Sequence, residues 1–374
     1  MRFGKNVIVG VLSFFLAPAV YSFELGSFEV TPVATVKEQY DDNITSDHTD
    51  VLSDFSTLLS LDLEGVRETK TETLKIVGSI DQEIFTKEHD FNNTSQGVLA
   101  KYKKEFSAYD RLTVDNTFTH ADKPTSLDDE FGRVAGRYDY FKNTFKLGGE
   151  HDFTEQLTVK GRYVADYYDP SKTGLKSSML HKPGIEAAYA LNSRTIGSLF
   201  YDYSNYAYEP GGTATKHTTG AGVRRFFTSQ IYLDVKGAAD YINTITRDNT
   251  IKAMYFVGLT NEFDETTQGG ISFTKSSDFR YSSSALFESW RVTASWGRQF
   301  TERMRFNIAA FTGIGEDVQS GSEEKFNGVI TGLEFEVSRN VKLGVDYAFR
   351  QRDAEAADQD YDKNTVTMGI TVKF

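Results

Sequence analysis

Apolar and polar residues alternate along most of this chain, and the alternation is clearest at its C-terminal end. The residues at every second position from Val366 to Phe374 are apolar, and those between them are Thr, Gly or Lys. Because successive side chains of a strand point to opposite faces, this segment would have one apolar and one polar face. The same pattern recurs in 157–167, 304–310, 329–337 and 341–350. It predicts strands that separate lipid from water.

Short polar turns separate the alternating runs at nearly constant intervals. From Phe106 onward, turns that begin with an apolar residue recur after 47 residues and then every 36–38, and Phe374 lies 37 residues after the last, at Val337. A unit of this length holds two strands, one short turn and one longer loop. From their turn-forming residues, we predict short turns at 67–70, 107–110, 153–156, 192–195, 227–230, 264–267, 301–303 and 338–340.

The turns and runs together predict an all-β, transmembrane, up-and-down antiparallel β-barrel. Eight short turns give 18 strands, within a range of 16–18, if residues 28–40 form the first strand. Longer connections, such as 123–136, lie between the short turns. An even number of strands returns both termini to the periplasmic side of the bacterial outer membrane, where such barrels have their short turns.

The first residues have the pattern of a signal peptide. Arg2 and Lys5 precede an apolar stretch, and small residues allow cleavage after Ser22 or, as the alternative, after Ala19. This divides the chain into a signal peptide, 1–22, and a barrel, 23–374. No later run reaches the 18 apolar residues of a membrane helix.

Composition narrows the possible chemistry. The chain has no cysteine, which excludes a lipoprotein anchor, a disulfide framework and a thiolate metal site. Its formal charge of −12 argues against nucleic acid as a partner. We assign most histidines to loops and turns, without the pairing that a metal site or a nucleophilic triad needs; they are His48, His89, His120, His151, His181 and His217. We therefore expect no enzyme activity, no cofactor and no metal.

Two clusters of polar and aromatic residues allow more than one interpretation. The acidic run at Asp41–Asn43, with Asp47 and Asp50, favours a solvated external loop over a calcium site, because it lacks the ligand spacing of a calcium-binding loop. Tyrosines gather at 138–140, 163–168 and 201–208. They favour an interfacial girdle over a platform for sugars, although Tyr201 and Tyr203 lie where neither face is plainly apolar.

Charged residues of both signs occupy the polar face of the predicted strands. They could keep a water-filled pore open and set a field across it, or they could form salt bridges along the wall without any solute, and the two roles are compatible. The pore-lining candidates are Lys160, Arg162, Asp166, Arg291, Arg303, Arg305, Glu334, Glu336, Lys342, Asp346 and Arg350.

The C-terminal end of the chain and a stretch near its N-terminus each resemble known sequences. The terminal Phe374, with Val372 and Ile370 at alternate positions before it, resembles the signal that the barrel-assembly machinery reads. Thr31–Val33, Glu38–Ile44 and Ser53–Phe55 resemble the opening of the putative beta-barrel porin type 2 family, whose members are often encoded with genes for exopolysaccharide synthesis and export.

The resemblance implies an outer-membrane passage for exopolysaccharide, with polysaccharide and periplasmic export proteins as partners. The alternative is a general or solute-selective diffusion porin, and an outer-membrane enzyme is the least favoured class. The alternating strands themselves imply only membrane lipid as a partner.

Overall fold

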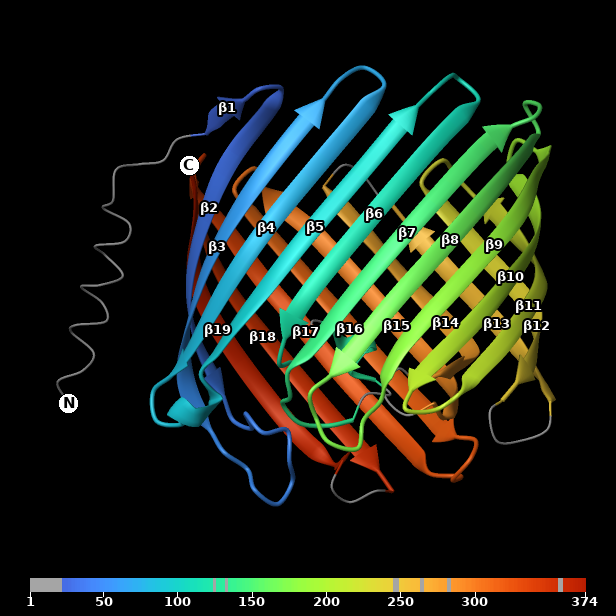
Figure 1. Ribbon diagram of the computed structural model, residues 1–374. Helices are drawn as coiled ribbons and strands as arrows, with labels where there is room; N and C mark the ends of the chain where they lie inside the picture. The colour runs from blue at the N-terminus through green and yellow to red at the C-terminus, as the bar shows by residue number, and fades with distance from the viewer. Residues whose placement is uncertain are drawn as a thin grey trace.

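The computed structural model describes residues 22–374 except 124–125, 132–133, 245–248, 263–265, 281–283 and 356–358. Strands β2 to β19 form a closed antiparallel sheet in which each strand pairs with the next and β19 pairs with β2 (Figure 1). The predicted all-β barrel of 18 strands is confirmed. The predicted signal peptide lies almost wholly outside the described residues and stays a prediction.

The strands are long, and one short strand precedes the barrel. Their bounds are β1 Phe23–Leu25, β2 Phe28–Asp41, β3 Asp54–Glu68, β4 Glu72–Phe85, β5 Asn93–Glu105, β6 Asp110–Ala121, β7 Tyr140–Asp152, β8 Leu157–Pro170, β9 Ser177–Asn192, β10 Thr195–Glu209, β11 Thr213–Phe226, β12 Ile231–Asn243, β13 Thr250–Asn261, β14 Thr267–Phe279, β15 Leu286–Thr301, β16 Met304–Asp317, β17 Glu323–Ser338, β18 Val341–Ala354 and β19 Tyr361–Lys373. The connections carry a 3-10 turn, η1 His89–Phe91, and one helix, α2 Leu127–Glu130. No helix among the described residues is long and apolar enough to cross a membrane.

Seven of the eight predicted short turns lie among the described residues, and each joins consecutive strands at one end of the barrel. The turn between β13 and β14 includes residues 263–265, outside the described part. Polar side chains build these turns: the Thr154 hydroxyl accepts hydrogen bonds from the backbone N–H groups of Gln156 (3.2 Å) and Leu157 (2.9 Å). Thr228 and Ser107 accept two such bonds in the same way. This local bonding is the reason why Ser and Thr mark the hairpins in the sequence.

The outward face of the wall is apolar, as alternation requires. Large apolar residues of the last strands are exposed there, among them Leu333, Leu343, Val345, Val366 and Met368. A row of exposed apolar residues also lies just before the short turns: Phe106, Phe153, Leu191, Phe227, Phe300 and Val337. Such a band and row are typical of a barrel wall in contact with lipid and its headgroup zone.

Both ends of the described chain lie at the short-turn end, next to each other (Figure 1). The backbone N–H of Phe374 donates to the carbonyl oxygen of Pro32 in β2 (3.0 Å), and the pairing from Thr365↔Asp41 to Lys373↔Val33 closes the barrel. Val372 and Ile370 lie in this closing strand. Their role as an assembly signal stays a prediction.

Several tyrosines differ from the predicted girdle. Tyr163, Tyr167 and Tyr201 lie on the outward face, but five others are buried inside the barrel near the end with the long loops: Tyr138, Tyr140, Tyr168, Tyr206 and Tyr208. Alternation along one strand explains the split, since Tyr201 and Tyr206 have opposite parity. A cluster of tyrosines therefore does not identify a girdle unless each residue is assigned to a face.

The histidines and the acidic run also differ from expectation. His120, His151, His181 and His217 lie in strands, where they contact aromatic rings, as in the stacking of His120 on Phe141 (centroids 4.3 Å apart). Asp41 and Asn43 are buried, and Asp42 accepts hydrogen bonds from the backbone and side chain of Asn364 (2.6 and 2.8 Å). These acidic residues therefore tie the first loop to β19.

A candidate constriction inside the barrel

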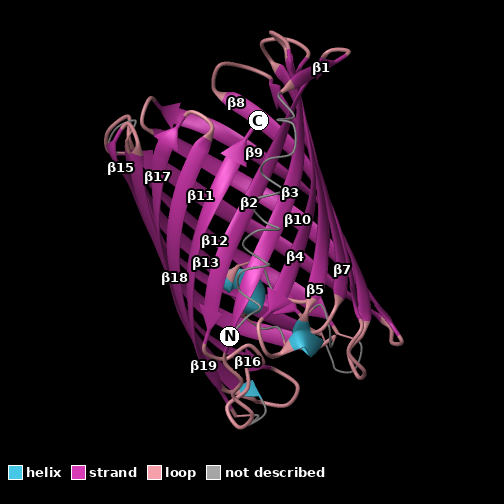
Figure 2. Cartoon of the chain, turned by 90° about the vertical axis from the view of Figure 1, so that its left-hand side faces the viewer, coloured by secondary structure: helices cyan, strands magenta, loops and turns pink. Residues whose placement is uncertain are grey.

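The connection between β6 and β7, residues 122–139, folds into the barrel; we call it the inner loop. Its base is held by the backbone N–H of Tyr138, which donates to the carbonyl of Asp122 (3.1 Å). The loop leaves the wall at β6 but contacts residues of β15 to β19, on the other side of the closed sheet. It therefore crosses the interior near the long-loop end, and its helix α2 is seen within the barrel (Figures 1 and 2).

Apolar contacts hold the tip of the inner loop against glycines of the far wall. The ring of Phe131 lies 5.3 Å from that of Phe287 and 5.4 Å from that of Phe311. A Cβ atom at Gly328 would lie 2.7 Å from a methyl carbon of Leu127, and one at Gly313 would lie 2.9 Å from the Phe131 ring. Only glycine leaves room for the loop at these positions, because interiors pack without spare volume.

A partly buried ion pair and a backbone hydrogen bond also hold the inner loop against the far wall. Glu130 of α2 lies 2.9 Å from the Arg350 Nε in β18 and accepts a hydrogen bond from the Tyr361 hydroxyl in β19. The backbone N–H of Ala135 donates to the side chain of Gln359 (2.7 Å). The loop is therefore tied to β18, to β19 and to their connection.

A second buried cluster fixes the base of the inner loop. The Arg137 guanidinium lies 2.6 Å from both the Glu83 and the Asp122 carboxylates, and the Lys123 ammonium lies 3.0 Å from Glu83. The Arg137 and Glu83 side chains are 7% and 6% exposed. Burial alone would lower the pKa of Arg137, but Glu83 and Asp122 outweigh burial and raise its pKa, so Arg137 stays charged.

The inner loop and the wall enclose a cavity of about 200 Å³. Basic and acidic side chains line it together: Lys123, Arg137, Arg350 and Lys363, with Asp41, Glu130 and Asp346. Most of them are paired, as Lys363 is with Asp41 (2.8 Å). Among the described residues Asp346 forms no ion pair, and its carboxylate occupies the space that Gly332 leaves by having no side chain. The cavity could therefore bind a small solute that carries charge, with Asp346 as a free acceptor.

The predicted pore-lining residues are spread along the wall, and the structure brings few of them to this cavity. Asp346 and Arg350 line it, whereas Lys160, Arg162 and Asp166 belong to a separate group in β8. Arg162 lies 2.7 Å from Asp202, and Asp166 accepts a hydrogen bond from Thr144 (3.0 Å). These contacts match the interpretation of salt bridges along the wall.

The remaining candidates lie on β15 to β18 or beside them. Lys342 lies 2.9 Å from Glu334 and 3.3 Å from Glu336. Arg291 donates to the Ser276 hydroxyl (3.2 Å), and Arg305 lies in β16. Arg303 is exposed in the turn between β15 and β16, outside the strands. The pore-lining role of all these residues stays a prediction.

Sequence reasoning missed the residues that build the constriction. Lys123 and Gly136 marked the bounds of a long connection, but Glu130 within it, Arg137 just after it and Glu83 in β4 were not singled out. One signal was present: Leu127 and Phe131 are large apolar residues in the longest predicted external connection. Apolar residues four apart in a loop indicate a helical turn with something to cover.

Among the comparisons with known proteins, only the one with solved structures finds similar proteins, and it supports the fold. No family model matches the sequence, and no curated protein matches it. Pseudomonas aeruginosa OccK2 (OpdF) is similar in structure with a TM-score of 0.50 and 10% identity, over 92% of this chain and 98% of that chain. P. aeruginosa OpdL has a TM-score of 0.49 and 12% identity, over 94% of this chain and 100% of that chain.

At such identities the likeness shows the fold alone, and no comparison assigns the chain to the porin type 2 family. The closed barrel and its apolar outer face indicate the location, because closed antiparallel barrels with such a face span bacterial outer membranes. The chain is an 18-stranded antiparallel β-barrel of the bacterial outer membrane.

Proposed function

We propose that this protein is a non-enzymatic diffusion channel for small charged solutes, with the inner loop as its constriction. The observation that carries the proposal is the cavity between the inner loop and β2, β17, β18 and β19, which is lined by charges of both signs. Binding sites for drug-sized ligands enclose about 300–1,000 Å³. A cavity of about 200 Å³ therefore suits a smaller solute.

Solutes with one positive and one negative group fit this lining best. Arg350 and Lys123 can meet an anionic group, and Asp346 can accept from a cationic one. Arg350 and Lys123 are also paired with Glu130 and Glu83, and this pairing keeps them from binding the solute too tightly, which a conducting site requires.

Passage of exopolysaccharide, which the resemblance implied, has less support. An extended glycan would have to displace the inner loop, and with it the Arg137–Glu83 and Arg350–Glu130 pairs. No comparison with known proteins points to polysaccharide, and the diffusion channel is the hypothesis that we favour.

Single-channel conductance and liposome swelling test the proposal. We expect the wild-type barrel in a planar bilayer to conduct small ions weakly and to exclude dextran. The variant Glu130→Gln/Phe131→Ala, which removes the Glu130 charge and the Phe131 ring from the loop tip, should conduct severalfold more and admit larger sugars. A wild-type protein that passes dextran as readily as small sugars would contradict the proposal, as would a folded variant no more conductive than the wild type.

A further inference from the structure

Strands β13 and β14 pair along only part of their length. Their ladder runs from Asn261↔Gly269 to Tyr255↔Lys275 and stops there. Residues 250–254 of β13 continue to pair with β12, and residues 276–279 of β14 continue to pair with β15, but no pairing joins the two segments to each other. We call this unpaired stretch, 250–254 against 276–279, the seam.

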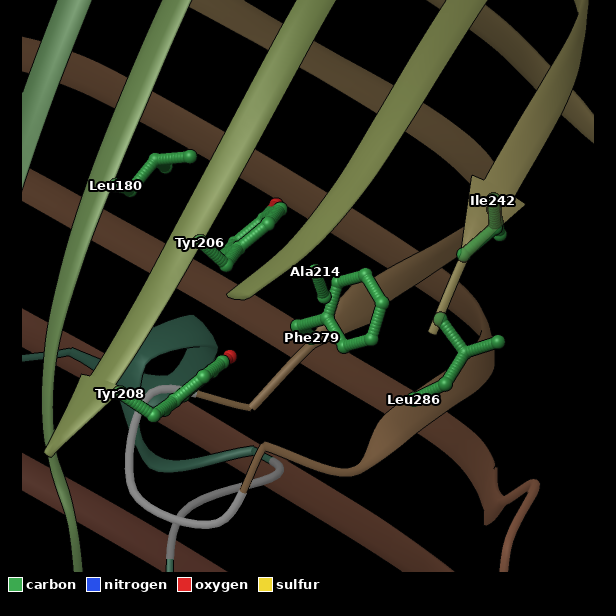
Figure 3. Close-up of a cluster of buried hydrophobic side chains, with 7 residues drawn as sticks. All are labelled: Leu180, Tyr206, Tyr208, Ala214, Ile242, Phe279 and Leu286. Atoms are coloured by element: carbon green, nitrogen blue, oxygen red, sulfur yellow. The ribbon is translucent and has the colours of Figure 1, made fainter. Parts of the chain in front are cut away.

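The seam exists because the β14–β15 hairpin bends into the barrel. Phe279 shares a strand face with Ile271, which is exposed on the outer wall, yet Phe279 is 4% exposed. Its ring lies 5.0 Å from that of Tyr206, on the inner face of β10. Figure 3 shows Phe279 and Leu286 among side chains from β9 to β12. The face of β14 that meets lipid nearer the short turns, at Ile271, is thus covered by the inner wall near the long loops, at Phe279.

Polar contacts from neighbouring strands replace part of the missing ladder. The Lys216 ammonium in β11 donates to the carbonyl of Ser277 (2.9 Å), in the unpaired part of β14. The Tyr208 hydroxyl donates to the carbonyl of Arg280 (3.0 Å). A carbonyl without a partner at membrane depth is costly, so these donors stabilise the bent hairpin.

A side-chain clasp closes the seam. Glu288 of β15 lies 2.7 Å from Lys275 of β14 and 2.7 Å from Lys252 of β13. It therefore bridges the two strands at the point where their backbone ladder ends, from the last paired residue of β14 to the unpaired part of β13. The Lys275 ammonium also lies over the Trp290 ring, 4.8 Å from its centre. Because all contacts across the clasp are made by side chains, it can open without breaking a backbone ladder.

The clasp lies between an apolar outer surface and an interior that is apolar at Ile242 and polar at Asp240, which faces Lys252 in the ladder of β12 and β13. Ile251, Tyr241 and Trp290 are exposed on the outer face, at 72%, 44% and 45%. Inside, Ile242 lies within the cluster of Tyr206, Phe279 and Leu286 (Figure 3). Two lysines held by one carboxylate thus lie between a lipid-facing surface and an interior in which an apolar cluster adjoins the buried Asp240 and Lys216.

We propose that the seam is a lateral port that binds a single-chain amphiphile with an anionic head group, such as a long-chain carboxylate. The anionic head would compete with Glu288 for Lys252 and Lys275, and the chain would enter between Phe279 and the inner wall. This port is independent of the route through the constriction at the inner loop.

Tryptophan quenching tests the port, since the chain has two tryptophans. In the variant Trp296→Phe, Trp290 is the remaining reporter, at the outer side of the clasp. In liposomes, brominated stearic acid should quench Trp290 at a membrane concentration about tenfold lower than the concentration at which its methyl ester quenches it to the same extent. Lys252→Gln added to this variant should remove the preference for the acid, whereas Lys325→Gln, at an exposed lysine of β17, should keep it. Equal quenching by acid and ester would contradict the proposal.

A second reporter distinguishes a port from binding at the outer surface. In the variant Trp290→Phe/Trp296→Phe/Phe279→Trp, the tryptophan lies inside the barrel. The acid should quench it, and Glu288→Gln should strengthen the quenching because the clasp is released. If the acid quenches Trp290 but leaves the interior tryptophan unquenched, the amphiphile binds outside and the port is excluded. Heat-modified mobility on gels confirms that each variant is folded, and unchanged conductance separates this result from the route through the constriction.

Discussion

The two ends of the barrel contain the same kinds of ion pair, but the pairs are exposed to solvent at one end and buried at the other. Near the short turns, Lys342 and Glu334 are 41% and 44% exposed. Near the long loops, Arg137 and Glu83 are 7% and 6% exposed, and Arg352 and Glu324 are 2% and 4% exposed. The difference arises because the inner loop and the bent β14–β15 hairpin fill the interior at the long-loop end.

This contrast shows that pairing alone does not determine what a charged residue contributes. An exposed pair contributes about 0–1 kcal/mol, since water screens it. A buried pair becomes costly when one partner is lost, because the other charge remains without solvent. The regular wall supplies the barrel, and the inserted segments convert part of its polar face into a buried site.

The largest effect is expected at the base of the inner loop. Glu83→Ala leaves the buried Arg137 with one carboxylate fewer and removes the partner of the more exposed Lys123, and we expect the free energy of unfolding to fall by about 3–5 kcal/mol. Urea titration of the folded barrel in detergent micelles measures the loss. The matched variant Glu334→Ala, at the short-turn end, should lose at most about 1 kcal/mol. Equal losses would remove the contrast between the two ends.

The glycines under the loop tip should give the next largest effect. Gly328→Val places a side chain against Leu127, and we expect a loss of about 1–3 kcal/mol and a displaced inner loop with higher conductance. At Gly344, on the inner face of β18, a Cβ would meet nothing within 4 Å. Gly344→Val should therefore leave the conductance unchanged. If both variants conduct like the wild type, the inner loop does not restrict the channel.

The sequence predicted the wall well, because the wall obeys a local rule. Strands of period two, such as 366–374, and turns with Ser or Thr, such as Ser107 and Thr154, specify faces and hairpins from neighbouring residues alone. The closure of β19 on β2 then follows from the even number of strands. Each of these features depends either on contacts within one hairpin or on the number of strands.

The constriction could not be predicted in the same way. Glu130 meets Arg350 across 220 residues of sequence, and Arg137 meets Glu83 because the loop turns inward rather than outward. Whether a loop folds inward depends on space at Gly313 and Gly328, which the alternation does not encode. The bend of β14 likewise places Phe279 inside, although its parity with Ile271 predicts the lipid face.

A smaller effect is expected from the free carboxylate of the cavity. Asp346→Asn removes one negative charge from the lining of the cavity without changing the shape of the side chain. An interaction of about 1 kcal/mol with a passing cation is reasonable near a protein surface, and its loss should lower the preference for cations about fivefold. The zero-current potential in a salt gradient measures this shift. Glu336→Gln, in an exposed pair with Lys342, provides the control and should shift the potential less.

The smallest effect belongs to the short-turn end, where local bonding rather than burial holds the structure. Thr154→Ala removes a hydroxyl that accepts from the backbone N–H groups of Gln156 and Leu157, and it should lower the free energy of unfolding by about 0.5–1.5 kcal/mol. Conductance should not change, because the turn lies far from the inner loop. The exposed neighbour Glu155→Ala should have a smaller effect still. A change of conductance in Thr154→Ala would mean that the two ends are coupled, and the comparison between them would then have to be given up.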